Sequence, residues 1–313
     1  MSKHGLLLVN LGSPAAPTTP AVKHYLTQFL GDQNVVTLPK ALWQPILKGI
    51  ILPIRSWRSA TFYRDCWLPN GSPLIVHTQE LTAKVQAALP NWEVKMAMTY
   101  EQPSIKQQLT ALQTSCDQVV VLSLFPHYTL STTKSIIDQV RAVDPQALIV
   151  DRFADDQRYL KILARQIQNS WEQGDYDRLI ISYHGIPTSM VRHGDPYQDE
   201  TRRTTKALRK LLSIPDNQIK MAYQSKFGPM PWLKPYLKNT LLQEVQLGHR
   251  NILLVTPSFV TDCLETIEED AVQNYQTFRE NGGNDLHLVP ALNANSDFAD
   301  FIASLAKESV AHA

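Results

Sequence analysis

The sequence has few cysteines, no excess of charge of either sign and no long unbroken hydrophobic run. The three cysteines form no C-x-x-C pair, which argues against a structural metal site and favours a reduced, cytoplasmic setting. The 30 Lys and Arg residues balance 29 Asp and Glu residues, so the charge does not indicate a nucleic-acid partner. The most apolar long window, residues 38–54, is interrupted by lysines and prolines and is unlike a membrane-spanning helix. Any partner is therefore expected to bind at a local site.

Nucleotide-phosphate and serine-nucleophile motifs are also missing. Gly12 stands alone after the first apolar run, without G-x-G-x-x-G or G-x-x-x-x-G-K-[ST]. This absence disfavours a dehydrogenase or an NTPase. No G-x-S-x-G motif presents a nucleophilic serine, which disfavours a hydrolase of that type.

The sequence does contain a regular alternation of short β-rich runs and helix-length segments. Eight runs bounded by Gly, Pro, Asn or Asp predict strands at 5–10, 93–99, 118–124, 148–152, 178–183, 218–224, 251–256 and 286–290. Such alternation is typical of an α/β fold with parallel sheets and crossover helices. At 313 residues the chain is long enough for two domains, and four predicted strands fall in each half.

The two halves also resemble each other in sequence, which predicts a duplicated unit. Residues 95–98 (KMAM) match residues 220–223 (KMAY), and residues 119–128 (VVVLSLFPHY) resemble residues 252–260 (ILLVTPSFV). We expect residues 1–155 to form the first domain, joined by a C-terminal helix over 296–313, and residues 156–295 to form the second. Chance similarity between apolar strands is the alternative explanation of the match.

Two strand-end loops carry a histidine, at the edge where open α/β sheets bind their ligands. His184 follows the strand 178–183 and is flanked by Gly185 and Pro187, which make a stiff turn. An imidazole held there can bind a metal or accept a proton near neutral pH. The alternative is an ordinary loop histidine held by hydrogen bonds, and His127 is open to the same two interpretations.

An acidic pair between residues 262 and 280 gives a more specific signal. Glu265 and Glu269 are spaced i, i+4, so on an α-helix they share one face, which Gln273 extends by another turn. Two unpaired carboxylates one turn apart repel, so a cation, water or basic side chains from elsewhere must offset their charge. The alternative is helix capping, with Asp262 as the N-cap and Glu265 at the third helical position.

Two apolar, aromatic segments complete the candidate features. Residues 38–57 have the pattern of an amphipathic lip flanked by Arg55 and Arg58, with a core helix as the alternative. Residues 227–233 hold a glycine and two prolines before Trp232, and such a rigid loop could wall a flat hydrophobic ligand. Ordinary core packing would explain a single Trp equally well.

Taken in order, these motifs resemble those of ferrochelatases, the enzymes that insert ferrous iron into a porphyrin in the last step of haem synthesis. The resemblance covers most of the chain, and its last three motifs together are highly specific. The matching segments are LLVNLGSP (7–14), NGSPL (70–74), FPHYTLSTT (125–133), SYHGIP (182–187), YQSKFGPMPWLKP (223–235) and SFVTDCLETIEE (258–269). The resemblance implies two similar Rossmann-like domains of the chelatase type, each a four-stranded parallel sheet flanked by helices.

The resemblance also implies roles for particular residues. His184 and Glu265 match the pair that faces the iron across the porphyrin cleft, and Glu269 lies on the route outward. Residues 38–58 match the apolar lip at the pocket mouth. The residues that match positions lining the pocket, holding a propionate or flanking the macrocycle are Arg55, Tyr63, Ser72, Tyr128, Lys226 and Trp232.

The implied function is that of a lyase that inserts Fe²⁺ into protoporphyrin IX to give protohaem. The apolar lip and residues 67–71 (WLPNG) favour that porphyrin over two alternatives, iron into coproporphyrin III or cobalt into a corrin precursor. A carrier that binds porphyrin or haem without reacting is the alternative of another class. We expect iron as a substrate, no permanently bound cofactor, no nucleic-acid partner, and a cytoplasmic monomer or homodimer whose residues 38–58 could touch a membrane.

Three departures from the family pattern stand out. Where many relatives have Asp-His-x-Glu before the acidic helix, this chain has Cys263 in place of the histidine. Gln273 replaces a carboxylate that some relatives carry, so the acidic row is shorter here. The cysteine-bearing C-terminal extension of the animal enzymes is lacking, so we expect no [2Fe-2S] cluster.

Overall fold

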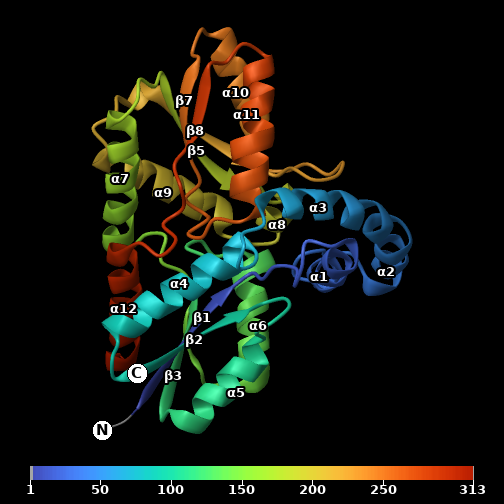
Figure 1. The fold of residues 1–313 in the computed structure, drawn as a ribbon, viewed down its shortest axis with the longest axis vertical. Helices are drawn as coiled ribbons and strands as arrows, with labels where there is room; N and C mark the ends of the chain where they lie inside the picture. The colour runs from blue at the N-terminus through green and yellow to red at the C-terminus, as the bar shows by residue number, and fades with distance from the viewer. Residues whose placement is uncertain (1–2, 313) are drawn as a thin grey trace. The chain divides into compact units, whose positions relative to one another are not determined.

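The structure, a computed structural model, describes residues 3–312. The chain divides into two compact units, Met1–Arg152 with Asn293–Ala313 (unit 1) and Phe153–Leu292 (unit 2). Each unit contains a four-stranded parallel sheet with helices on both faces (Figure 1). The predicted fold class, α/β with two similar parallel-sheet domains, is confirmed.

The sheet of unit 1 has a fully buried central strand. Its strands are β1 (His4–Asn10), β2 (Trp92–Met98), β3 (Gln118–Ser123) and β4 (Leu148–Val150), in the order β2-β1-β3-β4. Leu8 of β1 lies opposite Met96 of β2 and Leu122 of β3. Residues 6–9 of β1 are fully buried because helices cover both faces, which explains the continuous apolar run in the sequence.

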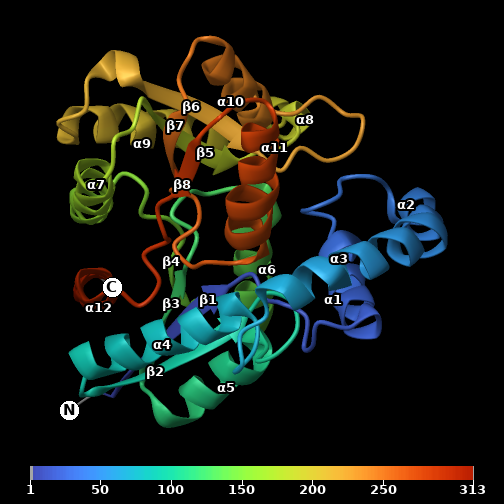
Figure 2. The ribbon, with the colours of Figure 1, turned by 45° about the horizontal axis from the view of Figure 1, so that its top comes forward.

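The helices of unit 1 come from both ends of the chain, and some of them cover this sheet. They are α1 (Thr19–Gly31), α2 (Lys40–Ile46), η1 (Leu47–Ile51, a π-helix), α3 (Leu52–Cys66), α4 (Pro73–Ala88), α5 (Ile105–Ser115), η2 (Leu130–Lys134, a π-helix), α6 (Ser135–Val143) and α12 (Ser296–Ala311). Leu7 and Val9 pack with α5 and α6, whereas α12 contacts α4, β3 and β4. Figure 2 shows α12 and α6 on opposite sides of β3 and β4. The C-terminal helix is thus an integral layer of unit 1.

Local capping explains where several of these helices begin. Ser72, Ser104 and Asn295 accept hydrogen bonds from the backbone N–H three residues later, at the starts of α4, α5 and α12. In α4 a proline follows the cap, at a position where its missing N–H has no intrahelical partner to lose.

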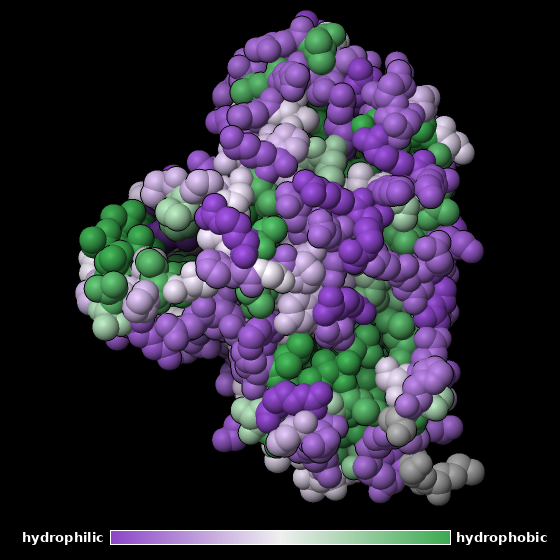
Figure 3. Space-filling view, turned by 180° about the vertical axis from the view of Figure 1, so that it is seen from behind, coloured by the Kyte–Doolittle hydropathy of each residue, from purple (hydrophilic) through white to green (hydrophobic). Residues whose placement is uncertain are grey.

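The predicted lip, residues 38–58, forms α2, η1 and the first part of α3. Its outer face exposes a stripe of large apolar side chains: Leu38, Leu42, Ile46, Ile50, Ile54 and Trp57. Figure 3 shows hydrophobic side chains gathered on the lip. The alternative of a core helix is therefore wrong for this face, and α2 has no buried residue. Among residues 3–312, no helix combines the length and the hydropathy needed to cross a membrane.

The sheet of unit 2 repeats the topology of unit 1. Its strands are β5 (Arg178–His184), β6 (Ile219–Gln224), β7 (Asn251–Val255) and β8 (Asp285–Leu288), in the order β6-β5-β7-β8. The helices are α7 (Gln157–Glu172), α8 (Thr188–Arg192), α9 (Tyr197–Leu211), η3 (Asp216–Gln218, a 3₁₀ helix), α10 (Leu237–Gln246), η4 (Glu265–Asn274, a π-helix) and α11 (Tyr275–Glu280). Figure 1 shows α7 and α9 on one side of the sheet and α10 and α11 on the other.

All eight predicted strands are present, each with ends within two residues of those expected. The segments that match in sequence occupy matching places, because 95–98 lies in β2 and 220–223 in β6, each next to the first strand of its unit. The common strand order supports the duplicated unit over chance similarity.

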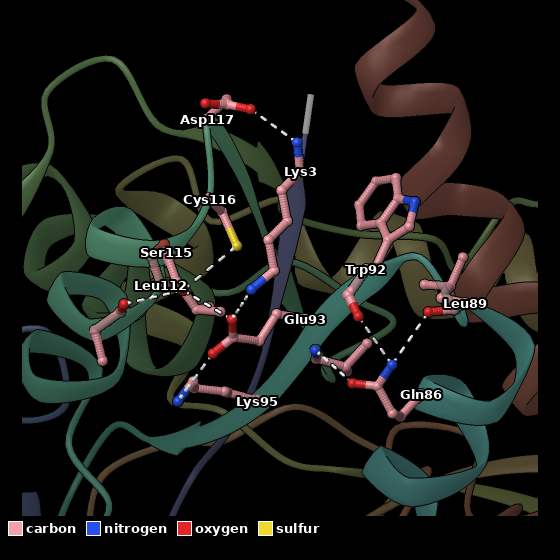
Figure 4. A network of polar contacts seen from close by, with 12 residues as sticks. Lys3, Gln86, Leu89, Trp92, Glu93, Lys95, Leu112, Ser115, Cys116 and Asp117 are labelled. Atoms are coloured by element: carbon pink, nitrogen blue, oxygen red, sulfur yellow. Dashed lines mark hydrogen bonds and ion pairs between the residues drawn. The ribbon is translucent and has the colours of Figure 1, made fainter. Parts of the chain in front are cut away.

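A polar network closes the N-terminal edge of the unit 1 sheet (Figure 4). Lys3 Nζ and Ser115 Oγ each donate a hydrogen bond to Glu93 Oε2 at 2.8 Å. The Lys3 backbone N–H donates to Asp117 Oδ2 at 2.8 Å. The hydrogen bond from Lys3, followed by that from Ser115, lowers the pKa of Glu93 to about 2. These contacts join β1 and β2 to the end of α5, far along the strands from the predicted ligand-binding edge.

Candidate functional site

The predicted site residues fall into two groups, one in each unit. His184, Lys226, Trp232, Glu265 and Glu269 belong to unit 2, and Arg55, Tyr63, Ser72 and Tyr128 belong to unit 1. Within unit 2, the residues come from the carboxyl ends of β5 and β6 and from the start of η4. This is the edge at which open α/β sheets bind their ligands.

His184 is the last residue of β5, and its ring is held in one orientation. Its Nδ1 lies 2.7 Å from the carbonyl oxygen of Gly185. Because a carbonyl can only accept, Nδ1 carries the hydrogen, and the neutral ring keeps its lone pair on Nε2. The His184 backbone N–H donates to Ser258 Oγ at 3.2 Å, and the ring of Phe259 lies 6.1 Å away, centroid to centroid. The imidazole is thus fixed as a base at Nε2.

The loop that carries Trp232 folds back onto the loop after His184. Leu233 N–H donates to the Ile186 carbonyl, and Thr188 N–H donates to the Pro231 carbonyl, each at 3.0 Å. These bonds bring the Trp232 ring to 6.4 Å from the His184 ring, centroid to centroid.

Gly185 makes this close approach possible. A Cβ at this position would lie 2.8 Å from the Gln224 carbonyl oxygen and 3.2 Å from the Trp232 ring. Its own N–H donates to the same Gln224 carbonyl at 2.9 Å. No larger residue fits without moving β6 or the Trp232 loop, so the turn predicted from Gly185 has a steric requirement as well.

The acidic segment is a π-helix, η4, and not the α-helix that the sequence predicted. Its backbone hydrogen bonds span five residues instead of four, an arrangement often found at functional sites. The capping alternative is also wrong, because Leu264 is the N-cap and no side chain caps the helix. Asp262 instead accepts a hydrogen bond from Thr266 Oγ1 at 3.0 Å. Helix capping therefore does not explain why residues 265 and 269 are both acidic.

Glu269 is held by the residue that follows β6. Ser225 donates its backbone N–H to Glu269 Oε1 at 2.8 Å and its hydroxyl to Oε2 at 2.6 Å. Burial raises the pKa of Glu269, and the charge of Glu265 raises it further. The Ser225 hydrogen bonds oppose this rise, and so does the positive charge of His184 when its ring is protonated. His184, Glu265 and Glu269 are therefore close enough to act on one another electrostatically.

Cys263, which departs from the Asp-His-x-Glu pattern implied by the family resemblance, is a buried thiol. Burial raises its pKa well above the ordinary value, and the neighbouring Glu265 carboxylate raises it further. The thiol thus stays protonated near neutral pH and is a poor metal ligand. Within residues 3–312, no group of three or more His, Cys, Asp or Glu side chains is arranged to hold a metal ion.

The unit 1 group lies on α3, at the start of α4 and after β3. Tyr63 is buried and packs edge-on against Trp67, with ring centroids 6.2 Å apart. Ser72 is the N-cap of α4 and accepts from Ile75 N–H, which leaves its own hydroxyl hydrogen for another acceptor. The guanidinium carbon of Arg152 lies 4.4 Å from the Tyr128 ring centroid. Arg55 is partly buried on α3.

Two features of the unit 2 site could not be predicted from the sequence: the backbone conformation of Ser225, and the contacts of Ser258 and Phe259 with His184. Ser225 has a φ of +62°, a left-handed conformation that is uncommon for a residue other than glycine and that clusters at functional sites. Lys226 follows it and is exposed, with its ammonium 5.4 Å from the Tyr236 ring centroid. Ser258 and Phe259 lie in a strand-end loop whose polar and ring side chains were visible, although their contacts with His184 were not.

Comparisons with known proteins show the family to which the chain belongs. A family model described as Ferrochelatase matches residues 3–310. The protein described as coproporphyrin III ferrochelatase from Limosilactobacillus reuteri (strain DSM 20016) is 64% identical over 305 residues, which cover 97% of this chain and 98% of that protein. A protein of the same description from Lactiplantibacillus plantarum (strain ATCC BAA-793 / NCIMB 8826 / WCFS1) is 57% identical over 304 residues, 96% of this chain and 94% of that protein.

A more distant relative has a broader description. The ferrochelatase of Enterobacter sp. (strain 638) is 39% identical over 312 residues, 97% of this chain and 98% of that protein. Among solved structures, SirB from Bacillus subtilis with Fe³⁺ has a TM-score of 0.55 at 11% identity, over 99% of this chain and 96% of that one. This last likeness concerns the fold alone.

Proposed function

Because the chain belongs to the ferrochelatase family and is a metal-inserting lyase, we propose that its porphyrin substrate is coproporphyrin III. The observation that carries this proposal is the description of the relatives: those at 64% and 57% identity over nearly the whole chain are both coproporphyrin III ferrochelatases. The sequence motifs favoured protoporphyrin IX and left coproporphyrin III open as an alternative. The relatives favour the second.

The charge around the predicted substrate residues supports the same porphyrin. Between Asp32 and Asp65 the chain has no acidic residue but carries five basic ones: Lys40, Lys48, Arg55, Arg58 and Arg64. Coproporphyrin III has four propionate groups, whereas protoporphyrin IX has two, with vinyl groups in place of the others. A porphyrin with more carboxylates gains more electrostatic stabilisation from surrounding basic side chains. Arg55, Tyr63, Ser72 and Tyr128 are the donors and rings that we assign to the substrate in unit 1.

In the proposed reaction, His184 accepts a pyrrole proton. Two N–H protons leave the porphyrin as Fe²⁺ binds its four nitrogens, so a base near the ring centre speeds the exchange. The hydrogen bond from Nδ1 to the Gly185 carbonyl supports this role, since it keeps the lone pair on Nε2.

Glu265 and Glu269 are assigned to the iron. Carboxylate oxygens bind Fe²⁺ without closing its coordination shell, so the metal can move on to the porphyrin nitrogens. The partial burial of both carboxylates, and the charge that each places on the other, support an affinity for a cation between them. Trp232 and Lys226 would then border the macrocycle, and binding at its edges would help to hold the ring bent for metal entry.

Anaerobic initial rates with Fe²⁺ test the substrate directly. The loss of porphyrin fluorescence is followed with coproporphyrin III and with protoporphyrin IX in parallel. We expect kcat/KM to be at least about tenfold higher for coproporphyrin III, a difference that two additional charge-assisted contacts readily supply. A higher kcat/KM for protoporphyrin IX would overturn the proposal. A stoichiometric spectral shift without turnover would indicate a carrier.

A further inference from the structure

The buried carboxylate of Asp270 has no role in the reaction described above. Asp270 lies on η4 next to Glu269 and is fully buried. One of its oxygens accepts from Gln224 Nε2, and the other accepts from Asn274 Nδ2 at 3.0 Å. Both oxygens thus have amide donors, and no other type of side chain of this size offers two acceptors and no donor.

Gln224 connects Asp270 to the strand that carries His184. Its side-chain oxygen accepts from Ser182 Oγ at 2.7 Å, so the two amide atoms of Gln224 bridge η4 and β5. Its backbone carbonyl accepts from Gly185 N–H, and the Gly185 carbonyl accepts from the His184 ring. Fixing Gln224 therefore fixes the backbone that orients the imidazole.

The same residue also controls the acidic side of the site. Gln224 is the last residue of β6 and directly precedes Ser225, which gives both its donors to Glu269. Any movement of Gln224 would move Ser225 and the carboxylate it holds. Gln224 is thus the point at which the His184 contacts and the Glu269 contacts meet.

A carboxylate at this place is unfavourable for stability alone. Asp270 is fully buried in η4, directly after the acidic side chain of Glu269, and removing a carboxylate from water costs free energy. Buried charges of this kind are weak evidence for a contribution to stability, and an apolar residue would often serve the core as well. The retained carboxylate therefore points to a requirement for geometry.

We propose that Asp270 is a positioning residue for iron insertion. By holding Gln224 it sets the position of the His184 ring relative to the carboxylates of Glu265 and Glu269. Active-site groups need supporting hydrogen bonds of this kind to stay within about 0.5 Å of the productive geometry. The inference rests on the roles proposed for His184, Glu265 and Glu269.

The experiment compares three variants with the wild-type enzyme. Asp270→Ala leaves two buried amide donors without their acceptor. Asp270→Asn is the conservative variant, since its amide oxygen can accept from Asn274 and its N–H can donate to Gln224 once the Gln224 amide turns over. Glu244→Gln is the matched control, because Glu244 is also a buried acid of unit 2 but pairs with Arg178, at the other end of β5.

The readouts separate iron from porphyrin and activity from stability. For each variant, kcat and KM for Fe²⁺ are measured anaerobically, the Kd for the porphyrin is measured by fluorescence titration, and the unfolding midpoint is recorded. For Asp270→Ala we expect kcat/KM for Fe²⁺ to fall at least about tenfold, with the porphyrin Kd within about twofold of wild type. Asp270→Asn should recover most of this loss. Glu244→Gln should lower the unfolding midpoint and leave both constants unchanged.

Two results would overturn the proposal: normal Fe²⁺ kinetics in folded Asp270→Ala, or a loss in Asp270→Asn as large as in Asp270→Ala. If Asp270→Ala fails to fold, Ser182→Ala replaces it, because this variant releases Gln224 from β5 without removing a charge. Its kcat/KM for Fe²⁺ should then fall about threefold or more, and a normal value would count against the proposal. Running both porphyrins keeps the tests separate, since a preference for protoporphyrin IX would contradict the substrate proposal while leaving the Asp270 comparison intact.

Discussion

Ser225 gives both its backbone N–H and its hydroxyl to the carboxylate of Glu269, at 2.8 and 2.6 Å. The left-handed backbone of Ser225, with a φ of +62°, accompanies this two-point contact. Such a conformation persists in a folded protein only where the surroundings maintain it. The contact is therefore one of the features that set the charge of Glu269.

Replacing Ser225 tests this control through the pH dependence of iron use. Burial raises the pKa of Glu269, and the Ser225 hydroxyl opposes the rise, so Ser225→Ala raises the pKa further. Because the carboxylate form binds iron in the proposed reaction, the acid limb of kcat/KM for Fe²⁺ should move to higher pH, by about 0.5 to 1 unit.

Ser225→Gly is the control for backbone strain. It also removes the hydroxyl but accepts the positive φ without cost, so it should show the same pH shift with higher stability than Ser225→Ala. A pH profile that stays in place for both variants would exclude the hydroxyl as the cause.

Replacing His184 or Glu265 should stop iron insertion without stopping porphyrin binding. For His184→Ala we expect kcat to fall about 10²- to 10⁴-fold, the usual contribution of a positioned base, and for Glu265→Gln a similar loss. Fluorescence decay under anaerobic conditions reports insertion, and fluorescence titration reports binding. His193→Ala, which replaces an exposed histidine directly after α8, is the matched control. Near-normal turnover in both site variants would contradict the assignment.

Gly185 should tolerate no side chain. A Cβ would lie 2.8 Å from a backbone oxygen, which cannot move away as a flexible side chain could. Gly185→Ala is expected to lower the free energy of unfolding by about 1–3 kcal/mol, as overpacking does, and to reduce turnover by displacing Trp232. Urea unfolding and the insertion assay measure the two effects. Gly49→Ala, where a Cβ meets no atom within 4 Å, should not lower the free energy of unfolding, because Ala is the better helix former.

The network at the base of unit 1 predicts a pH-dependent contribution to stability. The pKa of Glu93 falls from 4.5 to about 2 in the folded chain, so its contribution is present above about pH 4.5 and is lost as the pH falls toward 2. Glu93→Gln should therefore unfold at lower urea than wild type at pH 6, and the two midpoints should converge between pH 4.5 and 2. The exposed Glu280→Gln serves as the control. A midpoint difference that is independent of pH would show that the charge is not responsible.

The strands could be predicted because each is a short apolar run between turn residues, and burial on both faces makes that pattern continuous. His184 and Glu265 could be proposed because strand-end loops and paired acids are visible in one dimension. The π-helical form of η4 was not predictable, since the i, i+4 spacing of Glu265 and Glu269 suits an α-helix equally well.

The contacts that support the site could not be predicted from the sequence, for a different reason. Gln224 and Asp270 are 46 residues apart, and amides and acids at such separation carry no local periodic signal. The left-handed Ser225 is set by contacts with η4, and a serine has no intrinsic preference for that conformation. Tertiary packing determines both the contact between Gln224 and Asp270 and the backbone conformation of Ser225.

The return of α12 to unit 1 bears on how the chain folds as it leaves the ribosome. Unit 2 is one uninterrupted segment and can bury its own core as soon as Leu292 has emerged. The earlier-made unit 1 must wait for Phe298 and Ile302, both fully buried, to cover β3 and β4. Nascent unit 1 therefore exposes the part of its sheet formed by β3 and β4 until α12 has been synthesised, and during that interval it is the half more in need of chaperone protection.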